Sequence, residues 1–99
     1  MNDESSIDLR NAVMHRHPTA ISSDLDGETV ILDMESGKYH SLDTTGTRIW
    51  ELLQNRISLN DIVLQLVDEY SVGQEQCITD VTDFIQKMLA SGLVITETP

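Results

Sequence analysis

The spacing of apolar residues changes at Asp43, and this change restricts the chain to folds that combine strands with helices. In the run "ETVILDM", Val30, Leu32 and Met34 occupy alternate positions, and a period of two is typical of a strand. After Asp43, apolar residues recur at intervals of three and four, which places them on one face of a helix. Strands before helices, in only 99 residues, predict one small α+β domain with a single core.

Two turn signals divide the region before Asp43 into a three-stranded antiparallel meander. Asp26-Gly27 favours a tight hairpin turn, and it separates "TAISSD" from "ETVILDM". Ser36-Gly37 gives a second turn, after which "KYHSL", residues 38–42, is predicted as the third strand.

The first 18 residues mix charged residues, Asn and Ser without a sustained period. Segments of this kind rarely bury enough apolar surface to become ordered. We therefore expect residues 1–18 to be a flexible N-terminal tail and the folded domain to occupy residues 19–96.

The boundaries of three helices follow from residues that cap helix ends. Asp43 or Thr44 precedes the first helix and Ser58 precedes the second, and side-chain oxygens of these residue types accept from free backbone N–H groups. Gly92 can adopt the left-handed conformation that ends a helix, so the third helix stops just before it. The predicted helices run from about residue 44 to 54, from 58 to about 71, and from about 74 to 91.

The second and third predicted helices carry apolar faces of different width. The second has one continuous stripe, made of Leu59, Ile62, Val63, Leu66, Val67 and Tyr70. In the third, we expect a core-facing stripe of Ile78, Val81, Ile85 and Leu89, with an apolar shoulder of Cys77, Phe84 and Met88 beside it. A shoulder wider than the core requires is a candidate wall for a binding site.

Gly46 stands one turn into the first predicted helix, where glycine costs about 0.5–1 kcal/mol relative to alanine. Close approach of another part of the chain usually offsets this cost. We expect the helix to pass close to the backbone of the second or third helix at Gly46, with the only tryptophan, Trp50, filling the core beneath it.

The charge of the chain argues against several classes of partner. Seventeen acidic residues against six basic ones give a formal net charge of −11, which opposes binding to nucleic acid and to anionic membranes. No apolar run approaches the roughly 18–20 residues of a membrane span. The acidic first residues also differ from a secretion signal, so we expect a cytoplasmic location.

The sequence predicts no catalytic, metal or cofactor site. Of the three histidines, His15 and His17 lie in the expected tail and His40 lies on a strand, so they form neither a metal triad nor a Ser-His-Asp arrangement. The single cysteine, Cys77, gives no zinc-binding spacing, and no glycine-rich phosphate loop occurs. We therefore expect a protein without enzymatic activity.

Three motifs, taken together, resemble a known family. They are the Gly-x-Tyr strand "GKY", the helix start "LDTTGTRIW" and the last helix "DVTDFIQKMLASGLV". In this order they resemble the PqqD family, the precursor-peptide recognition elements of pathways that modify ribosomally made peptides, and the resemblance covers residues 19–96. The hairpin "LDGETVILDMESGKY" is most similar to the stand-alone members from lasso-peptide pathways.

The resemblance implies a winged-helix-like fold and a non-catalytic, peptide-binding function. In this family the leader segment of a precursor peptide is added as a strand to the edge of the third strand, beside a groove bounded by the third helix. Carried over to this sequence, the implied contacts are Lys38, Tyr39, His40, Ser41 and Leu42 on the strand, and Cys77, Asp80, Val81, Phe84, Lys87 and Met88 on the helix.

The partners that the resemblance implies are the leader itself, a cysteine peptidase that removes it and an ATP-dependent cyclase. The acidic surface favours a leader that carries Lys or Arg, and Asp80 is the carboxylate expected to pair with it. Two of the implied contacts also have a purely structural interpretation, Val81 as a core residue and Tyr39 as a cross-strand packing residue.

A second function fits the same order of elements, that of a winged-helix transcriptional regulator that binds DNA. The third predicted helix carries Glu75, Asp80 and Asp83 among its polar residues. Phosphates oppose such an acidic face, so the charge favours the peptide-binding interpretation.

Overall fold

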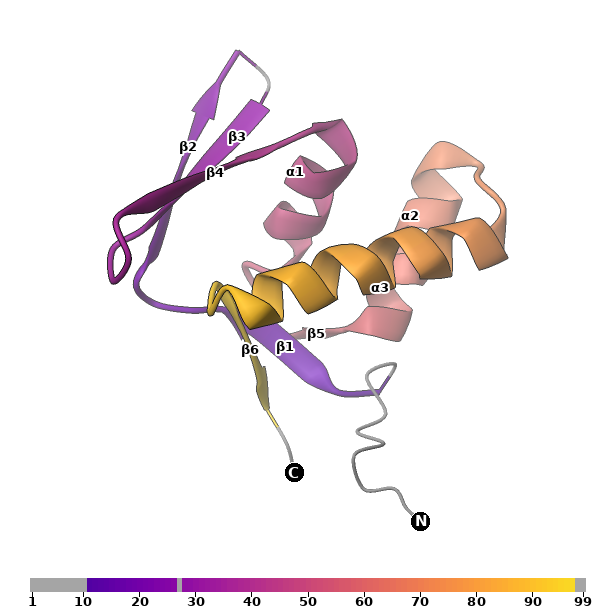
Figure 1. The fold of residues 1–99 in the computed structure, drawn as a ribbon. Coiled ribbons are helices and arrows are strands. Elements are labelled where there is room, and N and C mark those ends of the chain that lie inside the picture. Colours follow the sequence, from indigo (N-terminus) through magenta and orange to yellow (C-terminus); the bar gives the residue numbers. More distant parts are fainter. Residues whose placement is uncertain (1–10, 27, 98–99) are drawn as a thin grey trace.

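The computed structural model describes residues 11–26 and 28–97, and it shows an α+β domain with two small sheets and three helices. Figure 1 shows the β2-β3-β4 sheet beside the helices and the strands β1 and β6 beneath them. The predicted order of a meander followed by three helices is confirmed. None of the helices in the described ranges has the length and apolar character that a membrane crossing requires.

The predicted antiparallel meander is formed by β2 (Ala20–Leu25), β3 (Glu28–Asp33) and β4 (Lys38–Leu42). Two devices fix the turn between β3 and β4. Gly37 has a positive φ of 74°, which glycine adopts without a steric cost. The Asp33 carboxylate accepts from the Ser36 hydroxyl at 2.9 Å and from the Glu35 N–H at 3.1 Å.

The meander buries one face against the rest of the domain. On β3, Thr29, Ile31 and Asp33 are buried, whereas Val30 and Leu32 on the opposite face are half-buried. Figure 1 shows the helices on one side of this sheet only. The sheet therefore has an inner face towards the helices and an outer face away from them.

The caps predicted for the first two helices are confirmed. The Asp43 carboxylate accepts from the Gly46 N–H at 2.8 Å, and the Ser58 hydroxyl accepts from the Asp61 N–H at 3.1 Å. Gly92 follows the third helix with a φ of +75°, as a left-handed terminator does. The helices are α1 (Thr44–Leu52), α2 (Leu59–Tyr70) and α3 (Gln74–Ala90).

The prediction of a flexible tail through residue 18 is wrong for residues 13–16. These residues form β1 (Val13–Arg16), the central strand of a second sheet between β5 (Ile57–Ser58) and β6 (Val94–Glu97). Met14 of β1 is completely buried. Both partner strands come from distant parts of the chain, so no local period marks β1; residues 1–10 lie outside the described residues.

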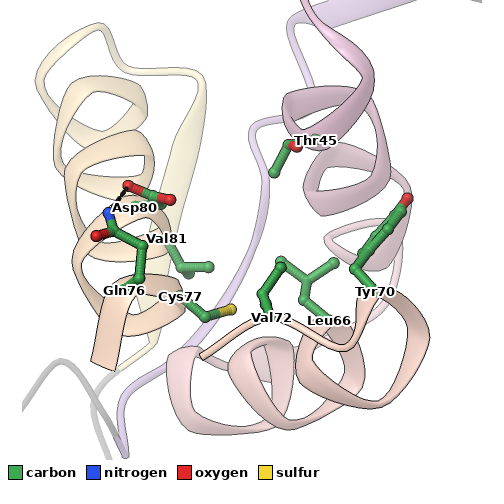
Figure 2. A pocket seen from close by; sticks show the side chains of 8 residues that line it. All are labelled: Thr45, Leu66, Tyr70, Val72, Gln76, Cys77, Asp80 and Val81. Atoms are coloured by element: carbon green, nitrogen blue, oxygen red, sulfur yellow. Dashed lines mark hydrogen bonds between the residues drawn. The ribbon is translucent and has the colours of Figure 1, made fainter. Parts of the chain in front are cut away.

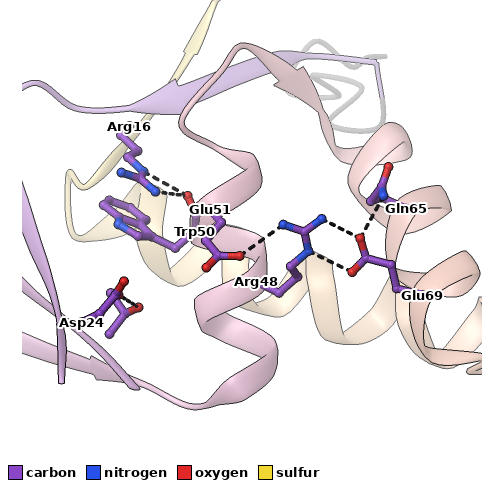
Figure 3. A network of polar contacts seen from close by, with 8 residues as sticks. Arg16, Asp24, Arg48, Trp50, Glu51, Gln65 and Glu69 are labelled. Carbon is purple, nitrogen blue, oxygen red and sulfur yellow. Dashed lines mark hydrogen bonds and ion pairs between the residues drawn. The ribbon is translucent and has the colours of Figure 1, made fainter. Parts of the chain in front are cut away.

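Arg16 holds β1 against α1, as Figure 3 shows. Its Nε and Nη2 donate to the Trp50 carbonyl at 2.9 and 2.6 Å, and its guanidinium carbon lies 4.6 Å from the centre of the indole ring, within cation–π range. Burial lowers the pKa of Arg16, while Glu51 and Asp24 oppose that shift. The side chain of Trp50, a residue of α1, is buried in the core, as predicted.

The apolar stripe of α2 is buried as predicted, except at its end. Leu59, Ile62, Val63 and Leu66 are in the core, but Tyr70 is exposed at the last helical position. The stripe of α3 is rotated relative to the prediction: Ile78 and Leu89 are half-buried, and the buried residues are Cys77, Val81, Ile85 and Met88. The sulfur of Cys77 lies 3.9 Å from the Val63 carbonyl oxygen of α2, so contact with α2 turns this face inward.

We predict that Met14→Ala lowers the free energy of unfolding by about 2–5 kcal/mol, because it leaves a cavity under β1. Met34→Ala is the matched control, since Met34 is 56% exposed and its truncation should change stability by no more than about 0.5 kcal/mol. Urea unfolding followed by circular dichroism measures both. Equal effects of the two substitutions would contradict the placement of β1 in the folded domain.

Candidate functional site

Among residues 11–26 and 28–97, no strand pairs with the outer edge of β4, because β4 is the last strand of the order β2-β3-β4. The Met34 N–H donates to the Thr19 carbonyl, so the backbone groups of Met34 point towards β2. Successive residues of a strand direct their backbone groups to alternate sides, so Ile31, three positions earlier, directs its groups towards β4. Its partner His40 therefore directs its backbone groups towards β3. The backbone N–H and C=O groups of Tyr39 and Ser41 therefore face the open edge.

A series of hollows runs between β4 and α3. The first lies beside His40 and Ser91, the second between His40 and Phe84, and the third between Phe84 and Asp80. A pocket at the N-terminal end of α3 shares Asp80 and Thr45 with the third hollow. Because adjacent hollows share lining residues, we treat them as one groove along α3.

The pocket that ends the groove lies between α2 and α3 and has a volume of about 290 Å³. Figure 2 shows the side chains of Leu66, Tyr70 and Val72 facing those of Gln76, Cys77 and Val81 across it. Polar groups stand at its rim, where the Gln76 amide donates to the Asp80 carboxylate at 2.9 Å. Burial, and then the charge of Asp80, raises the pKa of the Cys77 thiol. The pocket therefore offers an apolar interior with an acidic rim.

Gly46 lets Phe84 of α3 pack against the start of α1. A Cβ atom at Gly46 would lie 3.1 Å from Cε1 of Phe84 and 3.2 Å from Oδ1 of Asp43, closer than most real contacts. The expected approach of the third helix is therefore present, but the expectation of a backbone contact is wrong: a side chain approaches. Because Gly46 has no side chain, the Phe84 ring lies against the start of α1 and lines the groove between β4 and α3.

The structure brings most of the predicted site residues to the groove. Asp80, Phe84 and Lys87 line the groove from α3. Tyr39 is an exception: its exposed side chain lies opposite Leu32 on the outer face of the sheet, so only its backbone faces the open edge. Lys38, His40, Ser41 and Leu42 line it from β4. Four predicted residues lie mainly in the core and contribute only part of their surface to the lining: Leu42, Cys77, Val81 and Met88.

Several residues that line the groove were not predicted from the sequence. Thr45, Tyr70, Val72 and Gln76 surround the end pocket, and all of them lie at or beside the end of a helix. The one available signal was Tyr70, the last and largest residue of the predicted α2 stripe. Helix ends cover less of their apolar face, so such a residue is a candidate pocket wall.

An ion-pair network fixes the C-terminal end of α2 to α1 (Figure 3). The Arg48 guanidinium donates to both carboxylate oxygens of Glu69, at 2.8 and 2.5 Å, and to Glu51 at 3.1 Å. The hydrogen bonds from Arg48, and then from Gln65, lower the pKa of Glu69 to about 2. Because Tyr70 follows Glu69 directly, the network also positions one wall of the end pocket.

The groove is predominantly acidic. Asp43, Asp80 and Asp83 line it, and Lys87 is paired with Asp83 at 3.1 Å. Within residues 11–26 and 28–97, no three His, Cys, Asp or Glu side chains come together as a metal site. This arrangement suits an apolar ligand with basic groups.

Comparison with known proteins identifies the family. The family model for coenzyme PQQ synthesis protein D (PqqD) matches residues 28–94, which is more than half of the chain. The chain belongs to the PqqD family. A comparison of this chain with curated proteins gave no match.

Two solved structures resemble this chain over most of its length. One is TbiB1 in complex with the TbiA(beta) leader peptide, with 29% identity and a TM-score of 0.78 over 86% of this chain and 99% of that chain. The other is a lasso peptide synthetase B1 complexed with the leader peptide, with 24% identity and a TM-score of 0.74 over 83% and 96% of the two chains. The second likeness is one of fold.

We predict that the Arg48–Glu69 pair makes the stability of this domain depend on pH in the acid range. The pKa of Glu69 is lowered from 4.5 to about 2, so its contribution is complete above about pH 4.5 and is lost as the pH falls through about 2. Glu69→Gln should lower the melting temperature at pH 6, and its difference from the wild type should shrink towards pH 2.

Thermal unfolding between pH 2 and pH 6 tests this dependence, with Asp68→Asn as the control at the adjacent exposed acid. A Glu69→Gln difference that stays constant across this range would contradict the prediction.

Proposed function

We propose that this chain is a non-catalytic module that binds the leader segment of a ribosomally made precursor peptide in a lasso-peptide pathway. One observation carries the proposal: the free edge of β4 runs beside a groove on α3 that has an acidic rim and the apolar side chains of Phe84 and Met88 in its lining. The similarity to TbiB1, whose structure holds a leader peptide, supports the same function. The acidic groove gives no support to the alternative of DNA binding.

The leader binds as an added strand on β4. Tyr39 and Ser41 offer it backbone donors and acceptors, which provide affinity with little dependence on sequence. Successive side chains of a strand point to opposite faces, so every second leader side chain enters the groove. Selectivity then comes from the hollows that receive these side chains.

Two apolar sites along the groove select the leader. The hollow between His40, Phe84 and Met88 receives one apolar side chain, and the end pocket receives a second. Asp80 at the rim pairs with a basic leader residue. The proposed contacts are Lys38, Tyr39, His40, Ser41 and Leu42 on β4, with Cys77, Asp80, Val81, Phe84, Lys87 and Met88 on α3.

The other edge of the sheet, β2, is less suited to a peptide. The hollow beside it is lined mainly by polar and charged side chains, among them Arg16, Asp24 and Arg48. Arg16 and Arg48 already donate to Trp50 and Glu69, so a peptide would have to displace internal partners. The groove beside β4, with Phe84 and Met88 in its lining, therefore favours β4.

The bound precursor is passed to two enzymes, a cysteine peptidase that removes the leader and an ATP-dependent cyclase. We place this exchange in the cytoplasm, where precursor peptides are made. The module itself needs no cofactor or metal for this role, because binding and presentation involve no bond cleavage.

We predict a dissociation constant for the cognate leader in the micromolar range or tighter, about −8 kcal/mol or more favourable. Phe84→Ala should weaken binding at least tenfold, because it removes a wall of the groove, yet it should destabilise the fold less than Ile85→Ala. Ile85 is fully buried, so its truncation costs about 2–5 kcal/mol. Calorimetric titration and urea unfolding of both variants separate the two effects.

Absence of leader binding by the wild-type protein, together with duplex DNA binding at physiological salt, would overturn the proposed function. Unfolding of Phe84→Ala would instead place Phe84 in the core and remove it from the groove.

We predict that Ser41→Pro abolishes leader binding while the domain stays folded. Proline removes the N–H that faces the open edge but no bond of the β3–β4 ladder. Ser41→Ala is the matched control, since it removes the hydroxyl and keeps the N–H. His40→Pro removes an N–H that faces β3 and should destabilise the domain. Normal leader binding by Ser41→Pro would contradict strand addition at β4.

A further inference from the structure

Lys38 has an unpaired ammonium group in a chain that is rich in carboxylates. The sequence holds 17 acidic and six basic residues, so most cations find a partner. Three of the others form ion pairs: Arg48, Arg56 and Lys87. Arg16 donates to the Trp50 carbonyl. Among residues 11–26 and 28–97, Lys38 is the only Lys or Arg whose side chain makes neither an ion pair nor a hydrogen bond.

His40 stands beside Lys38 on the face of β4 that looks into the groove. The two residues lie opposite Ile31 and Asp33, which belong to the buried face of β3, and alternate residues of a strand share one face. Within the described part of the chain, the His40 ring also makes no hydrogen bond or ion pair. Two unpaired donors therefore lie next to each other along the groove.

Both side chains line the hollow between the β3–β4 turn and the C-terminal end of α3. Figure 1 shows that end of α3 on the side of the turn. Ser91, which follows α3, adds a hydroxyl to the same lining. The hollow therefore combines an ammonium, an imidazole and a hydroxyl, all of which can donate to one acceptor.

Asp33 does not satisfy these donors, although it is the carboxylate among the described residues that line the hollow. Its oxygens accept from the Ser36 hydroxyl at 2.9 Å and from the Glu35 N–H at 3.1 Å. These hydrogen bonds, first the one from Ser36, lower the pKa of Asp33. Asp33 lies directly opposite Lys38, yet its carboxylate is engaged within the turn, so Lys38 remains available to a ligand.

A leader strand on β4 would place one side chain against this hollow, a step that rests on the proposed function. Directly opposite residues of adjacent strands point to the same face, with Cβ atoms about 4.5–5.5 Å apart. The leader residue opposite Lys38 would therefore lie beside its ammonium. His40 would be its diagonal neighbour at about 7–8 Å, within reach of a long side chain.

We propose that Lys38, His40 and Ser91 form a subsite for an acidic side chain of the leader, Asp or Glu. The carboxylate pairs with the Lys38 ammonium and accepts from the His40 ring and the Ser91 hydroxyl. Such charge-assisted hydrogen bonds are stronger than neutral ones. The unpaired cation of the free domain thus acquires its partner only when the leader is bound.

The groove then selects a leader by the order of its charges. Asp80 and Asp83 line the opposite end, where a basic leader residue pairs. Leu42, the last residue of β4, lies four positions from Lys38, so the basic and acidic leader residues are at least four positions apart. A leader with these two charges exchanged meets like charges at both ends, and such repulsion discriminates between peptides.

The test titrates the full chain with the synthetic leader of its own precursor peptide. Lys38→Gln removes the ammonium from an exposed side chain and should leave the fold intact. Arg56→Gln is the matched control, because Arg56 is 70% exposed and its ion pair is with Glu97 of β6, away from the groove. In the leader, each Asp is replaced singly by Asn and each Glu by Gln.

We expect Lys38→Gln to weaken leader binding about threefold, the size typical of a cross-strand charge pair, and Arg56→Gln to leave it unchanged. Neutralising one leader acid should cost the same factor with the wild type and nothing further with Lys38→Gln. Replacing that acid by Lys should weaken binding to the wild type but strengthen binding to Lys38→Glu. A purely structural role of Lys38 would not produce this exchange.

Equal affinity of Lys38→Gln and the wild type would overturn the inference while leaving the proposed function intact. Equal losses in Lys38→Gln and Arg56→Gln would also overturn it, because the effect would then be one of net charge. So would a leader in which no acidic residue is coupled to Lys38. Failure of the wild type to bind any leader would instead refute the proposed function.

Discussion

The junction between β4 and α1 determines the geometry of the whole site. The Asp43 carboxylate accepts from the Gly46 N–H at 2.8 Å, and the Asp43 carbonyl accepts from Thr47 at 2.8 Å, so the strand stops and the helix starts at one residue. This abrupt change directs β4 along α3, while the bare Cα of Gly46 admits the Phe84 ring. The edge that offers backbone hydrogen bonds and the wall that offers apolar contacts are thereby held together.

Features that depend on local chemistry were predictable from the sequence. Turn residues, helix caps and a clear period gave the meander, the three helices and the position of Gly92, since each follows from neighbouring residues. The resemblance to the PqqD family supplied the proposed location of the site on β4 and α3. Asp80, Phe84 and Lys87 line the groove there, and their contact with a leader stays a prediction.

Features that depend on distant contacts were not predictable. β1 pairs with β5 and β6, whose residues lie more than 40 positions away in the sequence. No pattern among the residues next to β1 predicts a strand there. The buried face of α3 includes Cys77 rather than Ile78 because α2 packs against Cys77, and the apolar period of α3 does not contain that contact. The end pocket forms where the C-terminal end of α2 meets the N-terminal end of α3. Interpreting each predicted helix separately does not show that these two ends meet.

The pairing of β1 with β6 brings the two ends of the domain together. Val13 lies opposite Glu97, and Figure 1 shows both strands at the opposite end of the domain from the β2–β3 hairpin. A linker attached at either end would leave the β4 edge unobstructed. The fold is therefore suited to tethering: fused to an enzyme, it would supply a captured peptide at an effective concentration set by linker length rather than by diffusion.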